Sequence, residues 1–416
     1  MKKGIALLLL LQVSLTVVRS QYTALPQIPA QQFPVTAYGA IADGKTDNTT
    51  AIQTALDKAR SSGGQVIITK GVFICGPLKL YDKTQLILEK DAVLRLRNDI
   101  DTYPAANGKY QNFIQVSGAS DIKISGQGTI DGQGAIWWQK YTAKELTIRR
   151  PQMLFIENTD RIEIEGITFL NPPNTHLSLK NTSQVYIHDI TIQAPANSRN
   201  TDGINISTRN CTIERCTINT GDDNIALNFG NKSSGNNFEC ENILISNCKF
   251  GYGHGMSIGS FTAGGLRNLL VTDCTFDGTT SSIRIKSARG RGGIVENLTY
   301  NNIDIRNSKW PVFISAYYPK EPDQPQSDSV VAANDKTPAY RHISLKHITI
   351  TNCTEAIKIW GLAEKPIEDV LFEDVKINAT QGATIYNARQ VKFINSSIIA
   401  QKGEKLKTYQ AEVSGL

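Results

Sequence analysis

The chain has 416 residues, a hydrophobic content of 40% and a formal net charge of +6 at pH 7. This mild positive charge does not indicate binding to nucleic acid or to a membrane surface, although it is compatible with an anionic substrate if basic residues converge on one place. A chain of this length usually forms two or three domains, unless a repeat architecture joins it into one body.

The N-terminus has the composition of an export signal. Lys2 and Lys3 precede the apolar run IALLLLLQVSLTVV, and the small residue Ser20 marks a plausible cleavage point. The apolar run is too short to span a bilayer comfortably, so an uncleaved membrane anchor is the weaker alternative. We expect residues 1–20 to be a signal peptide and the mature protein to be exported, secreted or periplasmic, without stable membrane insertion.

One helix is predicted near the start of the mature chain. The segment DNTTAIQTALDKARSSGG begins with polar N-cap candidates and has helical spacing at Ile52, Leu56 and Ala59 before two glycines. Asp43 and Asp47, just ahead of it, fit turn and cap positions. We expect residues 33–75 to cover the N-terminal end of the fold with this short helix.

From residue 162 onward a phrase of alternating apolar residues recurs nine times, from IEIEGITF to VKFINSSII, at intervals of 22 to 45 residues. Period-two alternation predicts strands with one buried face. Aligning the phrases gives one inward column of Ile167, Ile190, Cys216, Cys248, Cys274, Ile303, Ile348, Val375 and Ser397. A second column contains Phe169, Ile192, Ile218, Phe250, Phe276, Ile305, Ile350, Ile377 and Ile399.

These columns predict an all-β solenoid whose coils stack on one another, with residues 21–416 as a single domain. A sandwich or propeller is the alternative, but neither predicts columns of like residues along the chain. The longest interval contains a Pro-, Asp- and Ser-rich stretch, which predicts a long surface loop at about 319–340.

Three of the seven cysteines belong to the first column. Cys216, Cys248 and Cys274 alternate there with Ile and Val, so they are interpreted as small buried apolar groups. Cys211 and Cys240 could form a disulfide in an exported protein, and the sequence leaves this open.

A second series of strands carries polar residues at matching positions. The phrases TDGINI, DDNIAL, GHGMSI, SSIRIK and WPVFIS align on the inward residues Ile204, Ile225, Met256, Ile283 and Val312. Asp202, Asp223 and His254 then share one column on three successive coils, which lie about 4.8 Å apart. Asp222 precedes Asp223 in the turn and should project differently.

Arg284 and Lys286 follow Ile283 by one and three residues, so both point outward on one face. The register thus predicts a solvent-facing patch of three carboxylates, one imidazole and two cations. Such a patch fits inverting glycoside hydrolysis, which needs one protonated carboxyl and one carboxylate that activates water. The two cations could bind an acidic sugar.

The motifs NTD (200–202), GDD (221–223), GHG (253–255) and RIK (284–286), together with the N-terminal AYGAIADGKTDNTTAIQ, closely resemble the polygalacturonase family, glycoside hydrolase family 28. The resemblance extends over residues 33–400. It implies a right-handed parallel β-helix and inverting hydrolysis of pectin, with a pectic polysaccharide or oligogalacturonide as substrate. It implies neither cofactor nor metal, and we expect a monomer.

The resemblance also implies a role for each motif residue. Asp222 would be the general acid, Asp202 and Asp223 would hold the attacking water, and His254 would tune the acid. The residues that would contact the substrate are Asn200, Arg284, Lys286 and Tyr318, with Tyr317 as the rival of Tyr318. Many relatives have a bridged cysteine after the two aspartates, whereas this chain has Asn224.

Several functions remain as alternatives at this level. A rhamnogalacturonan-type hydrolase could use the same scaffold, a pectate lyase would use calcium and a basic residue, and a carbohydrate-binding solenoid would need no aligned acids. The sequence does not distinguish endo from exo action, because that depends on loops at the ends of the cleft.

Overall fold

The computed structural model describes residues 24–231 and 236–416. The predicted signal peptide lies outside these residues. In the part of the chain that is described, none of the helices combines the length and apolarity that crossing a bilayer requires.

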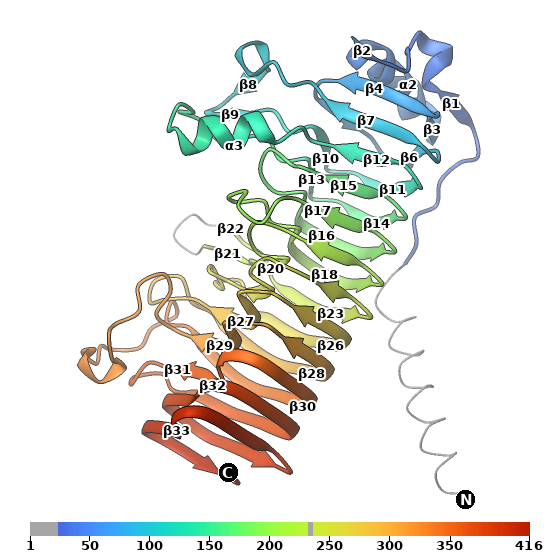
Figure 1. The fold of residues 1–416 in the computed structure, drawn as a ribbon. Helices are drawn as coiled ribbons and strands as arrows, with labels where there is room; N and C mark the ends of the chain where they lie inside the picture. Colours follow the sequence, from blue (N-terminus) through green and yellow to red (C-terminus); the bar gives the residue numbers. More distant parts are fainter. Residues whose placement is uncertain (1–23, 232–235) are drawn as a thin grey trace, which may run out of the picture.

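The described residues form a parallel β-helix, in which 29 strands belong to one hydrogen-bonded sheet (Figure 1). Its coils run from the N-terminal helix to the C-terminus, as the repeats predict. Each strand pairs in parallel with the strand one coil before and one coil after, so the sheet divides into three stacks. Long strands such as β16 (Leu177–His188) bend and contribute to two stacks.

The first stack contains β1 (Gln32–Pro34), β3 (Gly64–Ile68), β6 (Thr84–Leu88), β11 (Ser120–Gly126), β14 (Asp160–Glu165), β23 (Cys240–Ser246), and parts of β16, β18 (Ile204–Glu214), β26 (Leu266–Asp277), β28 (Ile294–Arg306), β30 (Ala339–Glu355) and β32 (Ile367–Ile394). The second contains β2 (Asp43–Asp47), β4 (Gly71–Cys75), β7 (Ala92–Leu96), β12 (Thr129–Asp131), β15 (Thr168–Leu170), β17 (Thr191–Gln193), β19 (Thr217–Asn219), β24 (Lys249–Phe250), the ends of β26, β28 and β30, and parts of β32 and β33 (Ser397–Ser414). The third contains β5 (Leu78–Leu80), β10 (Ile114–Ser117), β13 (Leu154–Glu157), the starts of β16 and β18, β20 (Ile225–Leu227), β25 (Met256–Ile258), β27 (Ser281–Lys286), β29 (Trp310–Ser315), β31 (Lys358–Trp360), and later parts of β32 and β33.

The predicted core columns are confirmed for the first eight coils and wrong for the last. Phe250 and Phe276 stack at a ring-centroid distance of 4.5 Å, as expected for neighbours in one column. On the ninth coil Ile377 pairs with Ile398. Ser397 is exposed, and Ile399, predicted to be inward, is 60% exposed. The predicted alignment of the ninth coil was displaced by one residue. Such a displacement moves every side chain of a strand to the opposite face of the sheet.

Helix α2 (Thr49–Ser62) forms where the sequence predicts it and buries Ile52, Leu56 and Ala59 at the N-terminal end of the solenoid. A second helix, α3 (Ala135–Thr142), was not predicted. It buries Trp137, whose ring meets the rings of Tyr103 and Tyr110 edge to face. Short 3-10 turns occur at η1 (Val35–Tyr38), η2 (Ile100–Thr102) and η4 (Pro325–Ser327).

Several excursions leave the solenoid on the same side (Figure 1). The hairpin of β8 (Ala105–Ala106) and β9 (Lys109–Tyr110) precedes β10, and α3 lies between β12 and β13. A further excursion carries the hairpin of β21 (Gly230–Asn231) and β22 (Asn236–Asn237). The last is the segment between β29 and β30, where a long loop was predicted. Arg289 fixes this loop through ion pairs with Asp328 at 2.7 Å and Glu364 at 2.6 Å.

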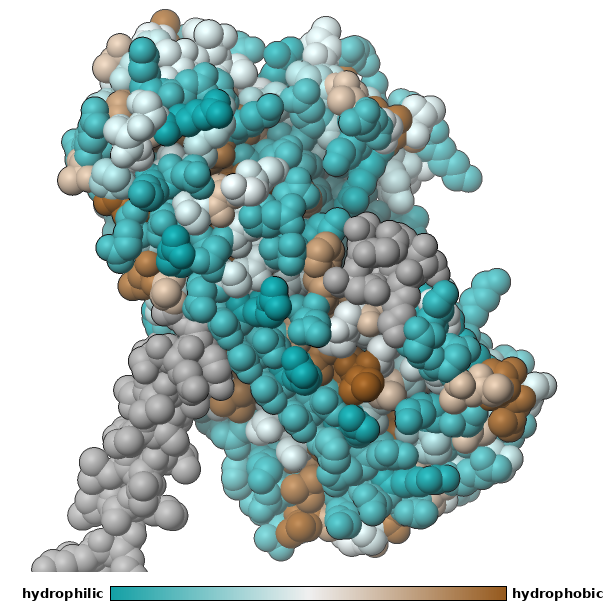
Figure 2. All heavy atoms as spheres, turned by 180° about the vertical axis from the view of Figure 1, so that it is seen from behind, coloured by the Kyte–Doolittle hydropathy of each residue, from teal (hydrophilic) through white to brown (hydrophobic). Residues whose placement is uncertain are grey.

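The face turned away from the viewer in Figure 1 is predominantly hydrophilic, with apolar side chains in small separate patches (Figure 2). All seven cysteines are buried and free, so the structure contains no Cys211–Cys240 disulfide. Cys216, Cys248 and Cys274 lie in the core as the column predicted.

Candidate active site

The predicted register of the third stack is confirmed. Ile204, Ile225, Met256 and Ile283 pair in succession, which places the turns before β18, β20 and β25 side by side. The turn before β25 depends on glycine: Gly255 has φ of 74°, and a Cβ there would lie 1.7 Å from the Ser281 carbonyl oxygen. The carboxylate and imidazole side chains therefore leave neighbouring coils at one edge of the sheet.

Asp223 is the most strongly held acid of this cluster. Its Oδ2 accepts a hydrogen bond from Lys286 Nζ at 2.8 Å, and its Oδ1 accepts one from Ser257 Oγ at 2.7 Å. Arg284 Nη1 also donates to Oδ1, at 3.2 Å. Asp223 and Lys286 are each only 5% exposed, so the expectation of a solvent-facing patch is wrong for these two residues. Pairing lets both charges lie beneath the surface.

Asp222 contacts the imidazole. His254 Nδ1 lies 3.1 Å from Asp222 Oδ1 and 3.8 Å from Asp223 Oδ1. Burial acts to raise the pKa of Asp222, but the hydrogen bond and charge of His254, with the Asp223 backbone N–H, hold this pKa below its usual value. In the free protein Asp222 therefore favours the ionised form.

Asp202 has the opposite electrostatic environment. Burial, followed by repulsion from Asp222 and Asp223, raises the pKa of Asp202 well above the usual range of a carboxyl group. Its Oδ2 accepts a hydrogen bond of 3.3 Å from Asn205 Nδ2. The crowding predicted from the sequence thus raises one pKa, and the affected group is Asp202.

The two cations differ in whether their donor groups already have hydrogen-bond partners. Lys286 is bound to Asp223, whereas Arg284 Nε is buried without a hydrogen-bond partner among the described residues. The Tyr318 ring lies 5.4 Å from the Arg284 guanidinium carbon and 5.1 Å from Lys286 Nζ. Tyr317 instead donates its hydroxyl proton to Asp328, at 3.2 Å. The structure thus brings Tyr318, rather than its rival, to the cations.

Asn200 is held in place by a residue that the sequence did not reveal. Its Oδ1 accepts a hydrogen bond of 3.0 Å from the buried Arg150, which also donates to the carbonyls of Pro173 and Arg199. The Arg150 guanidinium carbon lies 4.0 Å from the centroid of the Tyr141 ring. Arg150 therefore fixes the turn that carries Asn200, and no local motif identifies it.

Asn224 explains how the acidic turn is held without a bridged cysteine. This fully buried side chain donates to the carbonyls of Ile218 and Tyr252, both at 3.0 Å, and accepts from the Gly255 N–H at 2.7 Å. It therefore ties the turn containing Asp223 to the next coil, and a satisfied buried amide is a rigid support.

Asp222, Asp223 and His254 offer ligand atoms within 4.8 Å of one another, as a metal site would require. Both Asp223 oxygens already accept hydrogen bonds from Lys286, Ser257 and Arg284. The protein's own cations therefore already occupy the positions at which a metal ion would approach Asp223.

Comparison with known proteins places this geometry in a family. The profile of Glycosyl hydrolases family 28 matches residues 64–398, which include every residue of the cluster. The chain belongs to glycosyl hydrolase family 28. It is accordingly a glycoside hydrolase, and the expected parallel β-helix is the fold observed.

Members of family 28 similar to this chain include both modes of action. An endo-polygalacturonase of Pectobacterium carotovorum is 32% identical over 82% of this chain and 88% of its own length. An exopolygalacturonase of Zea mays is 30% identical, with 84% of each protein covered. The solved polygalacturonase of Erwinia carotovora superposes with a TM-score of 0.74 at 29% identity, over 89% of this chain and 98% of that one.

Proposed function

We propose that the protein hydrolyses α-1,4-linked galacturonic acid bonds in polygalacturonate with inversion of configuration. The observation that carries this proposal is the cluster itself, in which carboxylates from two neighbouring coils lie together and Asp223 is bound by Arg284 and Lys286. The family relationship and the polygalacturonase relatives support the same substrate class.

In this proposal Asp222 protonates the leaving oxygen, and Asp202 and Asp223 hold the attacking water. Arg284 binds the uronate carboxylate with the donors that Asp223 does not use, and Lys286 contributes positive charge beside it. Asn200 and Tyr318 contact the sugar. His254 adjusts the protonation of Asp222, to which its Nδ1 is adjacent.

Catalysis requires a proton on Asp222, whereas the free protein favours that proton on Asp202. Lys286 and His254 both contribute to the low pKa of Asp222. A substrate carboxylate bound beside Lys286 would offset this positive charge and raise the pKa of Asp222. An anionic substrate would in this way help to protonate its own acid catalyst.

The test is the release of reducing ends from polygalacturonate. Asp222→Asn should lower the turnover number by at least about 10³-fold, because general-acid catalysis and charge are both lost, while the thermal unfolding midpoint stays near that of the wild type. Near-wild-type turnover would contradict the assignment of Asp222. A calcium-dependent, ultraviolet-absorbing product would indicate a lyase, and NMR of the first product should show the inverted anomer.

We further propose that residues 1–20 are removed on export and that the protein acts as an extracellular or periplasmic monomer on plant cell-wall pectin. N-terminal sequencing of the exported protein should begin near Gln21. Light scattering after size exclusion should give the mass of one chain.

A further inference from the structure

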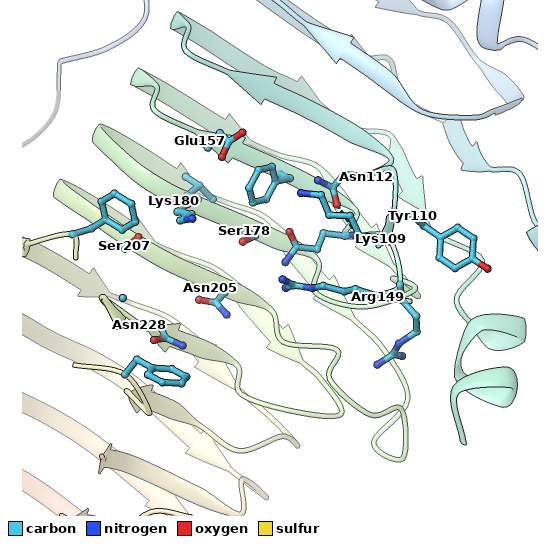
Figure 3. A pocket seen from close by; sticks show the side chains of 17 residues that line it. Lys109, Tyr110, Asn112, Arg149, Glu157, Ser178, Lys180, Asn205, Ser207 and Asn228 are labelled. Atoms are coloured by element: carbon cyan, nitrogen blue, oxygen red, sulfur yellow. Dashed lines mark hydrogen bonds between the residues drawn. The ribbon is translucent and has the colours of Figure 1, made fainter. Parts of the chain in front are cut away.

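The outer faces of the third and first stacks carry different groups of side chains. On the third stack, a pocket of about 510 Å³ is lined by residues that include Ser178 and Asn205 (Figure 3). Asn205 donates to Asp202, so this pocket adjoins the acid cluster. Strand β16 then bends from the third stack into the first. Its last residue, His188, alternates with the core residue Ile187 and therefore belongs to the outer face of the first stack.

Three side chains with metal-binding atoms converge on this outer face. Glu163 and Glu165 are two residues apart on β14, so they leave the strand on the same side. Glu165 pairs with His188 on the next coil. His188 Nε2 lies 3.4 Å from Glu163 Oε1 and 3.5 Å from Glu165 Oε2, and one ligand atom of each residue lies within 4.8 Å of the others. A tetrahedral site with bonds of about 2.0–2.1 Å separates its ligand atoms by about 3.4 Å, so the spacing fits Zn²⁺.

The imidazole of His188 is held in the tautomer that a metal ligand needs. Its Nδ1 lies 2.7 Å from Asp189 Oδ2, and Arg215 donates to both oxygens of Asp189, at 2.8 and 2.7 Å. A carboxylate ionised beside Arg215 only accepts hydrogen bonds, so Nδ1 carries the proton and Nε2 of the neutral ring has its lone pair free. The Tyr186 ring stacks on the imidazole at a centroid distance of 4.1 Å. A carboxylate behind the imidazole is the usual support of a metal-binding histidine.

The two carboxylates of β14 are also held in place. Lys123 on the preceding coil places its Nζ 3.0 Å from Glu163 Oε2 and 2.8 Å from Glu165 Oε1. The ammonium group thus orients both side chains through different oxygens from those that face the imidazole. In the acid cluster, by contrast, protein donors already bind both oxygens of Asp223.

The three side chains are partly enclosed. Those of Glu163 and His188 are 8% and 11% exposed, whereas that of Glu165 is 33% exposed. Bringing two carboxylates together beneath the surface is unfavourable unless cations compensate them. A divalent cation matches the two negative charges of this ligand set, and solvent can reach it beside Glu165.

We propose that Glu163, Glu165 and His188 bind one Zn²⁺ ion, with a water molecule as the fourth ligand. The ion joins β14 to β16 and stabilises the first stack. It lies on a different stack from the acid cluster, so the inference does not depend on the proposed function. No local motif marks the site, because 25 residues separate Glu163 from His188. Without the ion, a proton on Nε2 bridges to the same carboxylates.

The test is a calorimetric titration of Zn²⁺ into the whole protein, freed of metals with EDTA and then dialysed. It is run near pH 8, because a histidine binds metal in its neutral form. The wild type should bind one ion per chain, and its thermal unfolding midpoint should rise with the Zn²⁺ concentration. Ca²⁺ and Mg²⁺ should leave the midpoint unchanged, because they select oxygen ligands. Equal stabilisation by Ca²⁺ would overturn the zinc assignment.

Three substitutions separate the ligands from their support. His188→Gln and Glu165→Gln should each weaken Zn²⁺ binding by at least about 100-fold, and Glu165→Gln changes the more exposed position, where folding is least affected. Asp189→Asn touches no metal but removes the support of the imidazole. It should weaken binding by about 10- to 100-fold.

Two other histidines provide matched controls. His342 also pairs with an aspartate, Asp369, at 2.8 Å, and His254 belongs to the acid cluster. His342→Gln and His254→Gln should both bind Zn²⁺ as the wild type does. The proposal is overturned if the wild type binds no ion. It is also overturned if binding survives in His188→Gln and Glu165→Gln, or is lost in His254→Gln instead.

Discussion

Asp223 shows how the protein keeps three acidic side chains close together. Lys286, Arg284 and Ser257 all donate to its carboxylate, so one of the three negative charges is neutralised within the protein. Asp222 is stabilised by His254, and Asp202 has no comparable cation. The cluster therefore favours one proton, and repulsion places it on the least compensated acid.

Asp202→Asn should stabilise the protein progressively as pH rises. The raised pKa of Asp202 means that the folded state resists ionisation, whereas the unfolded carboxyl ionises near pH 3.9. Wild-type stability from this group is complete below that pH and is lost as pH rises through the folded pKa. Melting curves from pH 4 to 8 should show a growing advantage for the variant, about 1–2 kcal/mol at the upper end.

The control for this prediction is Asp101→Asn, since the Asp101 side chain is 91% exposed. It should show a small, pH-independent effect. An Asp202→Asn advantage that stays constant across the pH range would mean that the carboxyl is not held protonated by its surroundings.

The motif residues of the candidate site could be predicted from the sequence, because their spacing relative to an inward apolar residue repeats on each coil. The contacts that hold these residues in place could not be predicted from the sequence. Ser257 donates to Asp223 across 34 residues and Arg150 donates to Asn200 across 50. Such partners are fixed only when coils stack, and an isolated serine or arginine carries no sign of its contact. The burial of Lys286 was missed for the same reason.

At the scale of elements, the turns between the third and first stacks are joined by an asparagine ladder. Asn242 donates to Asn210 Oδ1 at 2.9 Å, and Asn268 donates to Asn242 Oδ1 at 3.0 Å. All three have φ between 56° and 59°. Asparagine tolerates this left-handed conformation better than most residues, and its amide can both donate and accept along the stack.

Asn242→Ala should lower stability by about 2–3 kcal/mol, because it loses both ladder bonds and places a Cβ-bearing residue without a polar side chain in the left-handed region. Asn242→Gly should cost less, about 1 kcal/mol, since glycine adopts positive φ freely but still lacks the amide. Thermal unfolding should rank the variants as wild type, Gly, then Ala. If Gly and Ala are equally damaging, backbone conformation is not the reason for asparagine at this turn.

The predictability of the elements has a similar limit. Columns of like residues predicted the stacked strands because each coil repeats the same environment, but the terminal coil has a neighbour on one side only. There the run NSSII gives two adjacent isoleucines, and the burial of Ile398 rather than Ile399 decides the register. Helix α3 lies in an excursion between coils, where no repeat constrains the sequence.

At the scale of the whole molecule, ionic networks connect coils on the faces that do not carry the acid cluster. Lys123 lies 3.0 Å from Glu163 and 2.8 Å from Glu165, both on β14 of the following coil in the first stack. His188 Nε2 lies 3.4 Å from Glu163, and its Nδ1 lies 2.7 Å from Asp189. Because Glu163 and His188 are largely buried, these charges depend on one another.

This network should make stability depend on the protonation of His188. Burial acts to lower the pKa of His188, but its hydrogen bonds to Glu163 and Asp189 outweigh burial and raise it. The resulting stabilisation is complete below the unfolded value of about 6.5 and is lost as pH rises through the folded pKa. His188→Gln should therefore lower the free energy of unfolding by about 1 kcal/mol or more near pH 5.5 and by much less near pH 9.

His342→Gln is the matched control, because His342 pairs with Asp369 at 2.8 Å with its side chain 52% exposed, and exposed pairs contribute little. The measurement is the unfolding midpoint of both variants against wild type across this pH range. The Tyr186 ring stacks on His188 at a centroid distance of 4.1 Å, so a His188→Gln deficit that persists at pH 9 would assign the residue's role to this packing rather than to charge.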